Sequence, residues 1–107
     1  MDALYIPTDN QCANNAELID GIAAAAKKPI IAGEEGICKG CGIATLSISY
    51  STIGYNTGLM AYEILVNGKN PADMPIQYDE GPVYKYDAAR CEAFGITVPE
   101  KYVAIAD

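Results

Sequence analysis

The sequence of 107 residues contains no histidine and no tryptophan, and only seven basic residues stand against 14 acidic ones. The absence of histidine excludes histidine acid–base catalysis, Ser-His and Cys-His nucleophile pairs, and histidine metal ligands. The formal net charge of −7, with no cluster of lysine or arginine, argues against binding to nucleic acid or anionic lipid. A GxGxxG motif is also missing, which counts against a nucleotide-dependent enzyme. We therefore expect no nucleic-acid partner.

Long apolar runs are missing as well. No run approaches the roughly 20 apolar residues that a membrane-spanning helix needs. Residues 1–10 contain neither the basic nor the apolar part of a signal peptide, so the targeting segment of an exported protein would precede Met1. The chain begins directly with a core-type strand, and its length fits one domain or less. We expect a piece of a larger ligand-binding protein.

The four cysteines are the candidates for metal or redox chemistry. Cys38 and Cys41 form a single CxxC, and a zinc site normally needs a second pair, which Cys12 and Cys91 are not spaced to supply. A thioredoxin-like CxxC would open a helix after a strand, whereas this one precedes Gly42 and a β-like run. We expect an exposed, glycine-flanked loop with ordinary or locally paired thiols, no bound metal and no cofactor.

The first third of the chain is typical of a strand–helix–strand unit. Residues 2–7 and 29–32 are short apolar strands, and residues 11–27 carry apolar side chains at helical spacing. A loop is expected over residues 33–36. Such a unit within about 30 residues predicts parallel strands joined by a right-handed crossover.

The rest of the chain continues the alternation of strands and helices. Residues 44–50 alternate, with Ala44, Leu46, Ile48 and Tyr50 on one face and Thr45, Ser47 and Ser49 on the other, where a covering helix is expected. The remaining predicted elements are a helix over 52–67 capped by Ser51 or Thr52 and ended by Gly68, a connector over 69–75, strand segments over 76–79 and 83–86, and a helix over 88–94. Together they predict an α/β fold, a partial Rossmann-like three-layer sandwich with a mainly parallel sheet.

Six segments of the chain, in register, carry a family resemblance. They are Asp2–Asn10, Lys28–Glu35, Gly42–Tyr50, Gly54–Gly58, Gly68–Ile76 and Phe94–Ile96 before Val98-Pro99. Together they resemble the C-terminal third of one family of ABC-transporter substrate-binding proteins, typified by tryptophan- and tyrosine-binding lipoproteins of Gram-positive bacteria. The resemblance covers essentially the whole chain, except that family members usually carry no CxxC at 38–41.

The resemblance implies a type I periplasmic-binding-protein fold, in which two Rossmann-like lobes close on a ligand about a hinge. Residues 1–107 would form its C-terminal portion. Within it, residues 1–50 would supply a βαβ unit of the second lobe and a hinge strand, and residues 51–75 a helix packed on the first lobe. Residues 76–107 would supply the returning strand and the C-terminal helix.

The candidate site residues follow the predicted strands. Thr8, Asp9 and Asn10 follow the first strand, and Glu34 and Glu35 follow the second. In open α/β sheets, ligands bind beyond the carboxyl ends of the strands, where a carboxylate, an amide and a helix N-terminus can meet a zwitterion. The alternatives are simple helix capping by Asp9 or Asn10 and a solvated acidic loop at Glu34 and Glu35.

Tyr50 is the sixth candidate site residue, at the end of the alternating strand. It would wall a ligand pocket or pack against the hinge. The two uses fit the sequence equally well.

We expect a non-enzymatic solute-binding component of an ABC importer that binds a small polar ligand, an amino acid. The full-length protein would work with a membrane permease. It would lie outside the cytoplasm, either in the periplasm or lipid-anchored at the cell surface. An alternative is a redox or sensor α/β module that uses Cys38 and Cys41, and a third is a structural fragment without activity. Because strands and a first lobe that would flank this chain are missing from it, we also expect self-association into a homo-oligomer.

Overall fold

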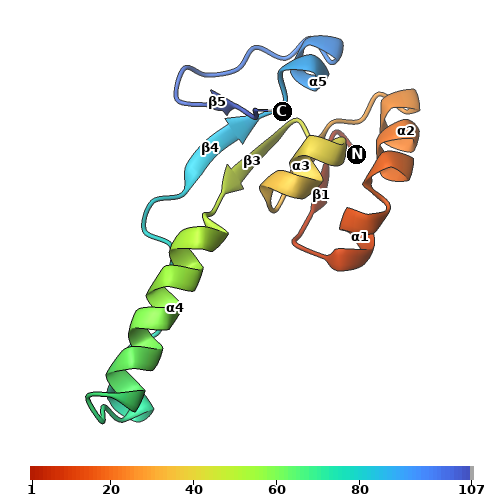
Figure 1. The fold of residues 1–107 in the computed structure, drawn as a ribbon. Coiled ribbons are helices and arrows are strands. Elements are labelled where there is room, and N and C mark those ends of the chain that lie inside the picture. Colours follow the sequence, from red (N-terminus) through yellow and green to blue (C-terminus); the bar gives the residue numbers. More distant parts are fainter. Residues whose placement is uncertain (107) are drawn as a thin grey trace. The chain divides into compact units, whose positions relative to one another are not determined.

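The computed structural model describes residues 1–106 (Figure 1). The chain divides into two compact units, which are described separately. One comprises residues 1–47 together with the chain from residue 83 onward, and the other comprises residues 48–82.

The first unit is built on a five-stranded sheet in which the strands follow one another in chain order. The β1–β2, β2–β3 and β4–β5 pairs are parallel, and β3–β4 is antiparallel, which confirms the predicted mainly parallel α/β sheet. The predicted strand segment over 76–79 is wrong, because those residues lie in the other unit and pair with no strand of the described chain. The strands are β1 (Leu4–Ile6), β2 (Ile30–Ala32), β3 (Ala44–Ser47), β4 (Val83–Tyr86) and β5 (Val103–Ala104).

The helix predicted over residues 11–27 is divided in two at Asn15. It forms α1 (Asn10–Asn14) and α2 (Ala16–Ala25), because Asn15 leaves the helical conformation at φ −118° and its side chain donates to the Gln11 carbonyl at 2.8 Å. Asparagine commonly competes with the helical backbone in this way. The short helix α5 (Ala88–Ala93) lies where it was predicted, with Asp87 as its N-cap.

The loop predicted over 33–36 is wrong beyond Glu34, and the glycine-flanked loop predicted around Cys38 and Cys41 is wrong, since α3 (Glu35–Cys41) occupies these positions. Its N-cap is Glu34, whose carboxylate accepts hydrogen bonds from the backbone N–H groups of Gly36 and Ile37. The side chain thus satisfies two donors that a helix start leaves free. The glycines in this stretch resemble a loop in the sequence, but the cap and the buried face favour a helix.

The core lies between the sheet and helices α2 and α3. Cys38 is fully buried and Cys41 nearly so, which corrects the expectation of exposed thiols. Close helix packing causes this burial, since a Cβ on Gly40 would lie only 2.6 Å from the Ala16 Cβ. The cluster consists of Ile6, Ala16, Ala23, Ile30, Ala32, Ile37, Cys38 and Cys41.

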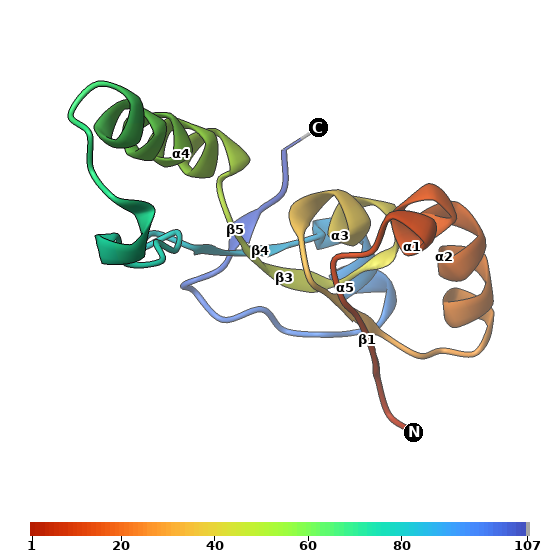
Figure 2. The ribbon, with the colours of Figure 1, turned by 90° about the horizontal axis from the view of Figure 1, so that it is seen from below.

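The two faces of the sheet are covered differently. Helices α1 to α3 lie on one side, and the segment between α5 and β5 passes on the other (Figure 2). Thr45 and Ser47 face the helices and are buried, as expected of the polar face of β3, whereas Leu46 on the opposite face stays 47% exposed. The segment over 96–102 covers part of that second face, where it lines a hollow with Ile31 and Tyr86.

The second unit consists of a helix and the segment that returns beside it. Helix α4 (Tyr50–Leu65) begins after Ser49, whose Oγ accepts from the Thr52 N–H at 3.1 Å, so the cap is Ser49 rather than Ser51 or Thr52. Gly68, predicted to end the helix, has a φ of +67°, a left-handed conformation that glycine adopts freely. A 3-10 helix, η1 (Pro71–Asp73), and an extended stretch over 74–82 follow.

Helix α4 has no buried residue. Among its large apolar side chains, Ile53 and Leu65 are exposed, whereas Met60 and Ile64 are half-buried. Across residues 1–106, no helix combines the length and apolar character needed to cross a membrane.

Candidate functional site

The loops that follow β1 and β2 touch at the carboxyl edge of the sheet. The Gly33 N–H donates to the Ile6 carbonyl at 2.7 Å, and the Thr8 Oγ1 donates to the Gly33 carbonyl at 3.4 Å. A Cβ on Gly33 would lie 2.8 Å from the Thr8 backbone nitrogen, so only glycine lets the two loops pack this closely. Five of the six predicted site residues stand on these two loops or on the first residues of the helices that follow them.

Asp9 caps the first of these helices. Its Oδ1 accepts from the Cys12 N–H at 2.9 Å, and this backbone hydrogen bond lowers the pKa of the Asp9 carboxyl below its ordinary value. Asn10 is the first residue of α1. The capping interpretation of Asp9 is therefore confirmed. The residue remains exposed, so capping does not exclude a second role at the surface.

Glu34 and Glu35 adopt different roles although they are adjacent. Both Glu34 oxygens face the start of α3, as its cap. Glu35 points toward the sheet, where its Oε2 accepts from Lys85 Nζ at 2.8 Å and from Ser47 Oγ at 3.1 Å. The Lys85 hydrogen bond, with Ser47 adding to it, lowers the pKa of the Glu35 carboxyl.

Ser47 and Lys85 join the candidate site, although neither was proposed as a site residue from the sequence. Ser47 has a weak sequence signal, since it is a polar residue on a strand face that was expected to lie under a helix. Lys85 has none, because its partner Glu35 lies 50 positions away in the chain. Among the described residues, the buried Thr45 Oγ1 beneath α3 has no hydrogen-bond partner.

The charges at this edge can serve a zwitterionic ligand. The carboxylates of Asp9 and Glu34 attract an ammonium group, and the Lys85 ammonium, with 28% of its side chain exposed, attracts a carboxylate. The hydroxyl of Thr8 adds a neutral donor and acceptor. The arrangement suits binding through hydrogen bonds and charge.

Tyr50 lies in the second unit, as the exposed first residue of α4, and does not end β3 as predicted. Strand β3 stops at Ser47, three residues earlier. Tyr50 therefore does not stand on the loops and helix starts that carry the five other predicted site residues.

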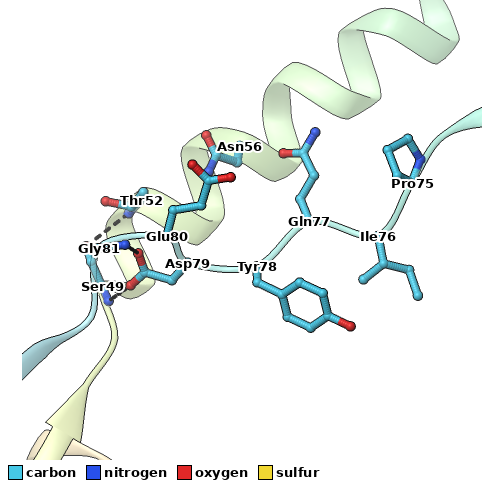
Figure 3. A pocket seen from close by; sticks show the side chains of 10 residues that line it. All are labelled: Ser49, Thr52, Asn56, Pro75, Ile76, Gln77, Tyr78, Asp79, Glu80 and Gly81. Carbon is cyan, nitrogen blue, oxygen red and sulfur yellow. Dashed lines mark hydrogen bonds between the residues drawn. The ribbon is translucent and has the colours of Figure 1, made fainter.

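A pocket lies beside the first turns of α4 within the second unit (Figure 3). Asp79 links two backbone segments that line the pocket. One of its carboxylate oxygens accepts a hydrogen bond from the Ser49 N–H at 2.7 Å, and the other accepts one from the Gly81 N–H at 3.0 Å. These backbone hydrogen bonds lower the pKa of Asp79. Asp79 was not singled out from the sequence, although an aspartate two residues before a glycine is a common turn signal. The lining residues are Ser49, Thr52, Asn56 and residues 75–81.

The cysteines show no sign of an activated thiol. Burial raises the pKa of Cys38 to about 12 and raises the pKa values of Cys41 and Cys91 above their ordinary range. A reactive cysteine needs the opposite, a lowered pKa and access to solvent. This environment argues against the redox alternative that was based on Cys38 and Cys41.

Comparison with known proteins gives a match over residues 1–107 to the family described as ABC transporter substrate binding protein. A curated relative is the tyrosine-binding protein of Clostridioides difficile (strain R20291), 38% identical over 76 residues, which are 71% of this chain and 22% of the relative.

Two solved structures resemble the chain across nearly its whole length. One is the ligand-free, open structure of a substrate-binding protein with adhesive properties from Clostridium difficile (TM-score 0.75, 34% identity, 98% of this chain and 36% of that chain). Another is the ABC domain from Streptococcus pneumoniae in complex with L-Trp (TM-score 0.79, 28% identity, 94% of this chain and 34% of that chain). The chain thus spans about a third of the solved structures and less of the curated relative.

Proposed function

This chain belongs to the ABC transporter substrate-binding protein family, and from that premise we propose that it supplies part of the binding site for an aromatic amino acid in an ABC importer. The observation that carries the proposal is the contact between the β1 and β2 loops, which gathers Thr8, Asp9 and Glu34 at the carboxyl edge of the sheet. Relatives that bind tyrosine and L-Trp indicate the ligand class.

The residues of this edge take distinct roles in the proposal. Asp9, together with Glu34 on the neighbouring loop, meets the ammonium group of the amino acid. Thr8 and Asn10 hydrogen-bond its polar atoms, and Glu35 holds Lys85 so that the Lys85 ammonium reaches the carboxylate. Tyr50, on the second unit, stays a candidate to contact the aromatic side chain of the ligand in the complete protein, a use that suits an aromatic residue.

The connections between the two units support a hinge. The chain leaves the first unit after Ser47 and returns at Val83. Ser47 and Val83 are paired neighbours in the β3–β4 ladder, so both connections start from adjacent strand ends. We propose that bending at these two points closes the site on its ligand.

The wider assignment follows from the family. We propose that the chain acts as the C-terminal portion of a binding protein, with residues 1–50 in the second lobe, 51–75 against the first lobe and 76–107 returning to the second. The whole protein would be non-enzymatic, would act outside the cytoplasm and would deliver its ligand to a membrane permease. The chain by itself would form homo-oligomers.

The test is a nuclear magnetic resonance titration of the 15N-labelled chain with L-tryptophan at millimolar concentrations. We expect the amide signals of residues 8–10 and 33–36 to shift. Asp9→Ala should weaken the response, whereas Asp73→Ala, which removes an exposed carboxylate from the second unit, should leave it unchanged. Shifts confined to other regions, or an undiminished response in Asp9→Ala, would contradict the proposal.

A further inference from the structure

Two connections join the units, and the first unit holds both of them at the end of the β3–β4 ladder. Ser47 and Val83 are the last paired residues of this ladder. Behind them, Ser47 Oγ at 3.1 Å and Lys85 Nζ at 2.8 Å donate to the same oxygen of Glu35. The backbone of both connections is therefore held in place up to the Ser47–Val83 pair.

A single carboxylate joins the same two connections within the second unit. One oxygen of Asp79 accepts from the Ser49 N–H at 2.7 Å, on the outgoing connection, and the other accepts from the Gly81 N–H at 3.0 Å, on the returning one (Figure 3). Hydrogen bonds to an ionised group are roughly twice as strong as those between neutral groups. We call this pair of hydrogen bonds the Asp79 link.

A local turn does not account for the whole of the Asp79 link. The hydrogen bond to Gly81 spans two positions and is an ordinary turn contact of aspartate. The hydrogen bond to Ser49 spans 30 positions and is the shorter of the two. Asp79 therefore does more than shape its own turn, because it also fixes where the outgoing connection lies relative to the returning one.

The Asp79 link is continuous with helix α4. Ser49, whose N–H is held by Asp79, also caps the helix through its Oγ, which accepts from the Thr52 N–H at 3.1 Å. Further along, the returning segment and α4 line a small hollow together. The helix and the returning segment thus form one body, which begins at Ser49 and ends at Gly81.

One residue in each connection lies between the ladder and the Asp79 link. It is Ile48 on the way out and Pro82 on the way back, and both lie outside helices and strands. The ring of proline fixes φ, so Pro82 contributes little more than its ψ angle to any bending. Few backbone torsions therefore remain free between the two units.

We propose that Asp79 is a positioning residue of the hinge, which confines bending to Ile48 and Pro82. The second unit then turns about the single line through these two residues, because two pivot points define one axis. This inference rests on the hinge of the proposed function and specifies its axis. Motion about one axis leaves less conformational entropy to be lost when the site closes on a ligand.

Residual dipolar couplings of the 15N-labelled 107-residue chain, without ligand, test the role of Asp79. Each unit reports its own degree of alignment, and the ratio of the second unit to the first falls below one when the second unit moves. We expect a ratio below one for the wild type and roughly half that ratio for Asp79→Ala, since several residues of each connection then become free. Asp79→Asn, which keeps one acceptor oxygen, should fall between them. The matched control is Glu80→Ala, which removes the neighbouring carboxylate and should leave the ratio unchanged.

A pair of proline substitutions tests the axis. Pro82→Gly frees φ at a proposed pivot and should lower the ratio, whereas Pro75→Gly, on the same returning segment but away from the pivot, should not. This pair decides the matter even if circular dichroism shows that Asp79→Ala melts α4. Equal effects of the two proline substitutions would overturn the proposed axis.

The outcomes separate this inference from the proposed function. A ratio below one that neither Asp79→Ala nor Pro82→Gly changes would overturn the inference alone. A ratio of one in every variant would overturn the hinge as well. Because no ligand is present, the amino-acid site can fail its own titration while the role of Asp79 stands.

Discussion

Lys85 and Glu35, 50 positions apart in the chain, meet through a 2.8 Å contact between Nζ and Oε2. The contact joins β4 to the first turn of α3, and Ser47 of β3 donates to the same oxygen. One carboxylate therefore links three elements of the sheet edge that is proposed to bind the ligand.

Replacing Glu35 should weaken this link in a pH-dependent way. The pKa of Glu35 is lower in the folded chain than its ordinary value. The contribution of Glu35 to the free energy of unfolding is therefore present above the ordinary carboxyl pKa and is lost as the pH falls through the folded-state pKa. Since both side chains are about a third exposed, we expect Glu35→Gln to reduce the free energy of unfolding at pH 7 by about 0.5–1 kcal/mol. Urea unfolding of the wild-type chain and of Glu35→Gln, at pH 7 and below pH 4, measures this difference in the free energy of unfolding. A difference that persists unchanged in acid would contradict the argument, and Glu100→Gln, an exposed carboxylate, serves as control.

Gly33→Ala should destabilise the contact between the β1 and β2 loops. The added Cβ would lie 2.8 Å from a backbone nitrogen, so one loop must move. We expect a loss of about 1–3 kcal/mol in the free energy of unfolding. The control is Gly21→Ala in α2, where the space is open and alanine should stabilise the helix by up to about 1 kcal/mol. Equal effects of the two substitutions in thermal unfolding would refute the close packing.

The native Cys38 thiol should resist modification. With a pKa of about 12, only roughly one thiol in ten thousand is ionised at pH 8, and burial blocks access as well. Labelling with a thiol reagent, followed by mass spectrometry, should modify Cys38 only after the chain is unfolded. The half-buried Cys12 is the internal comparison. Rapid labelling of Cys38 in the folded protein would revive the redox alternative.

The 107-residue chain alone should bind free amino acids weakly. Pockets for small ligands usually bury roughly 70% or more of the ligand, and one loop cluster offers only one wall. Calorimetry against the twenty common amino acids should give no dissociation constant in the low micromolar range or below. A tight complex with the monomeric chain would show that the described residues form a complete site.

The sequence predicted the elements that depend on local pattern. Strands β1 and β2 and their parallel pairing follow from apolar runs joined by a helical segment, and Asp9 could be recognised as a cap by its position. Helix α3 could not, because its glycines resemble a loop and its cap is a glutamate. Its existence depends on burial against α2 and the sheet, which no local pattern shows.

The candidate site was predictable to the extent that strand ends locate it. The Glu35–Lys85 contact could not be predicted, since it requires the antiparallel return of β4 after 35 intervening residues, residues 48–82. The end of β3 was placed too late because the alternation of polar and apolar residues continues past Ser47 into the cap of α4. Asp79 was missed because the segment around it was expected to be a strand.

The pairing of Ser47 with Val83 makes residues 48–82 an excisable insertion. Antiparallel neighbours can be joined by a two-residue turn such as Asn-Gly, so the first unit could be closed without the second. The sheet, α3 and the loops after β1 and β2 would all remain in the shortened chain. In evolutionary terms, such a boundary allows one unit of the molecule to be exchanged or redesigned while the other keeps its fold.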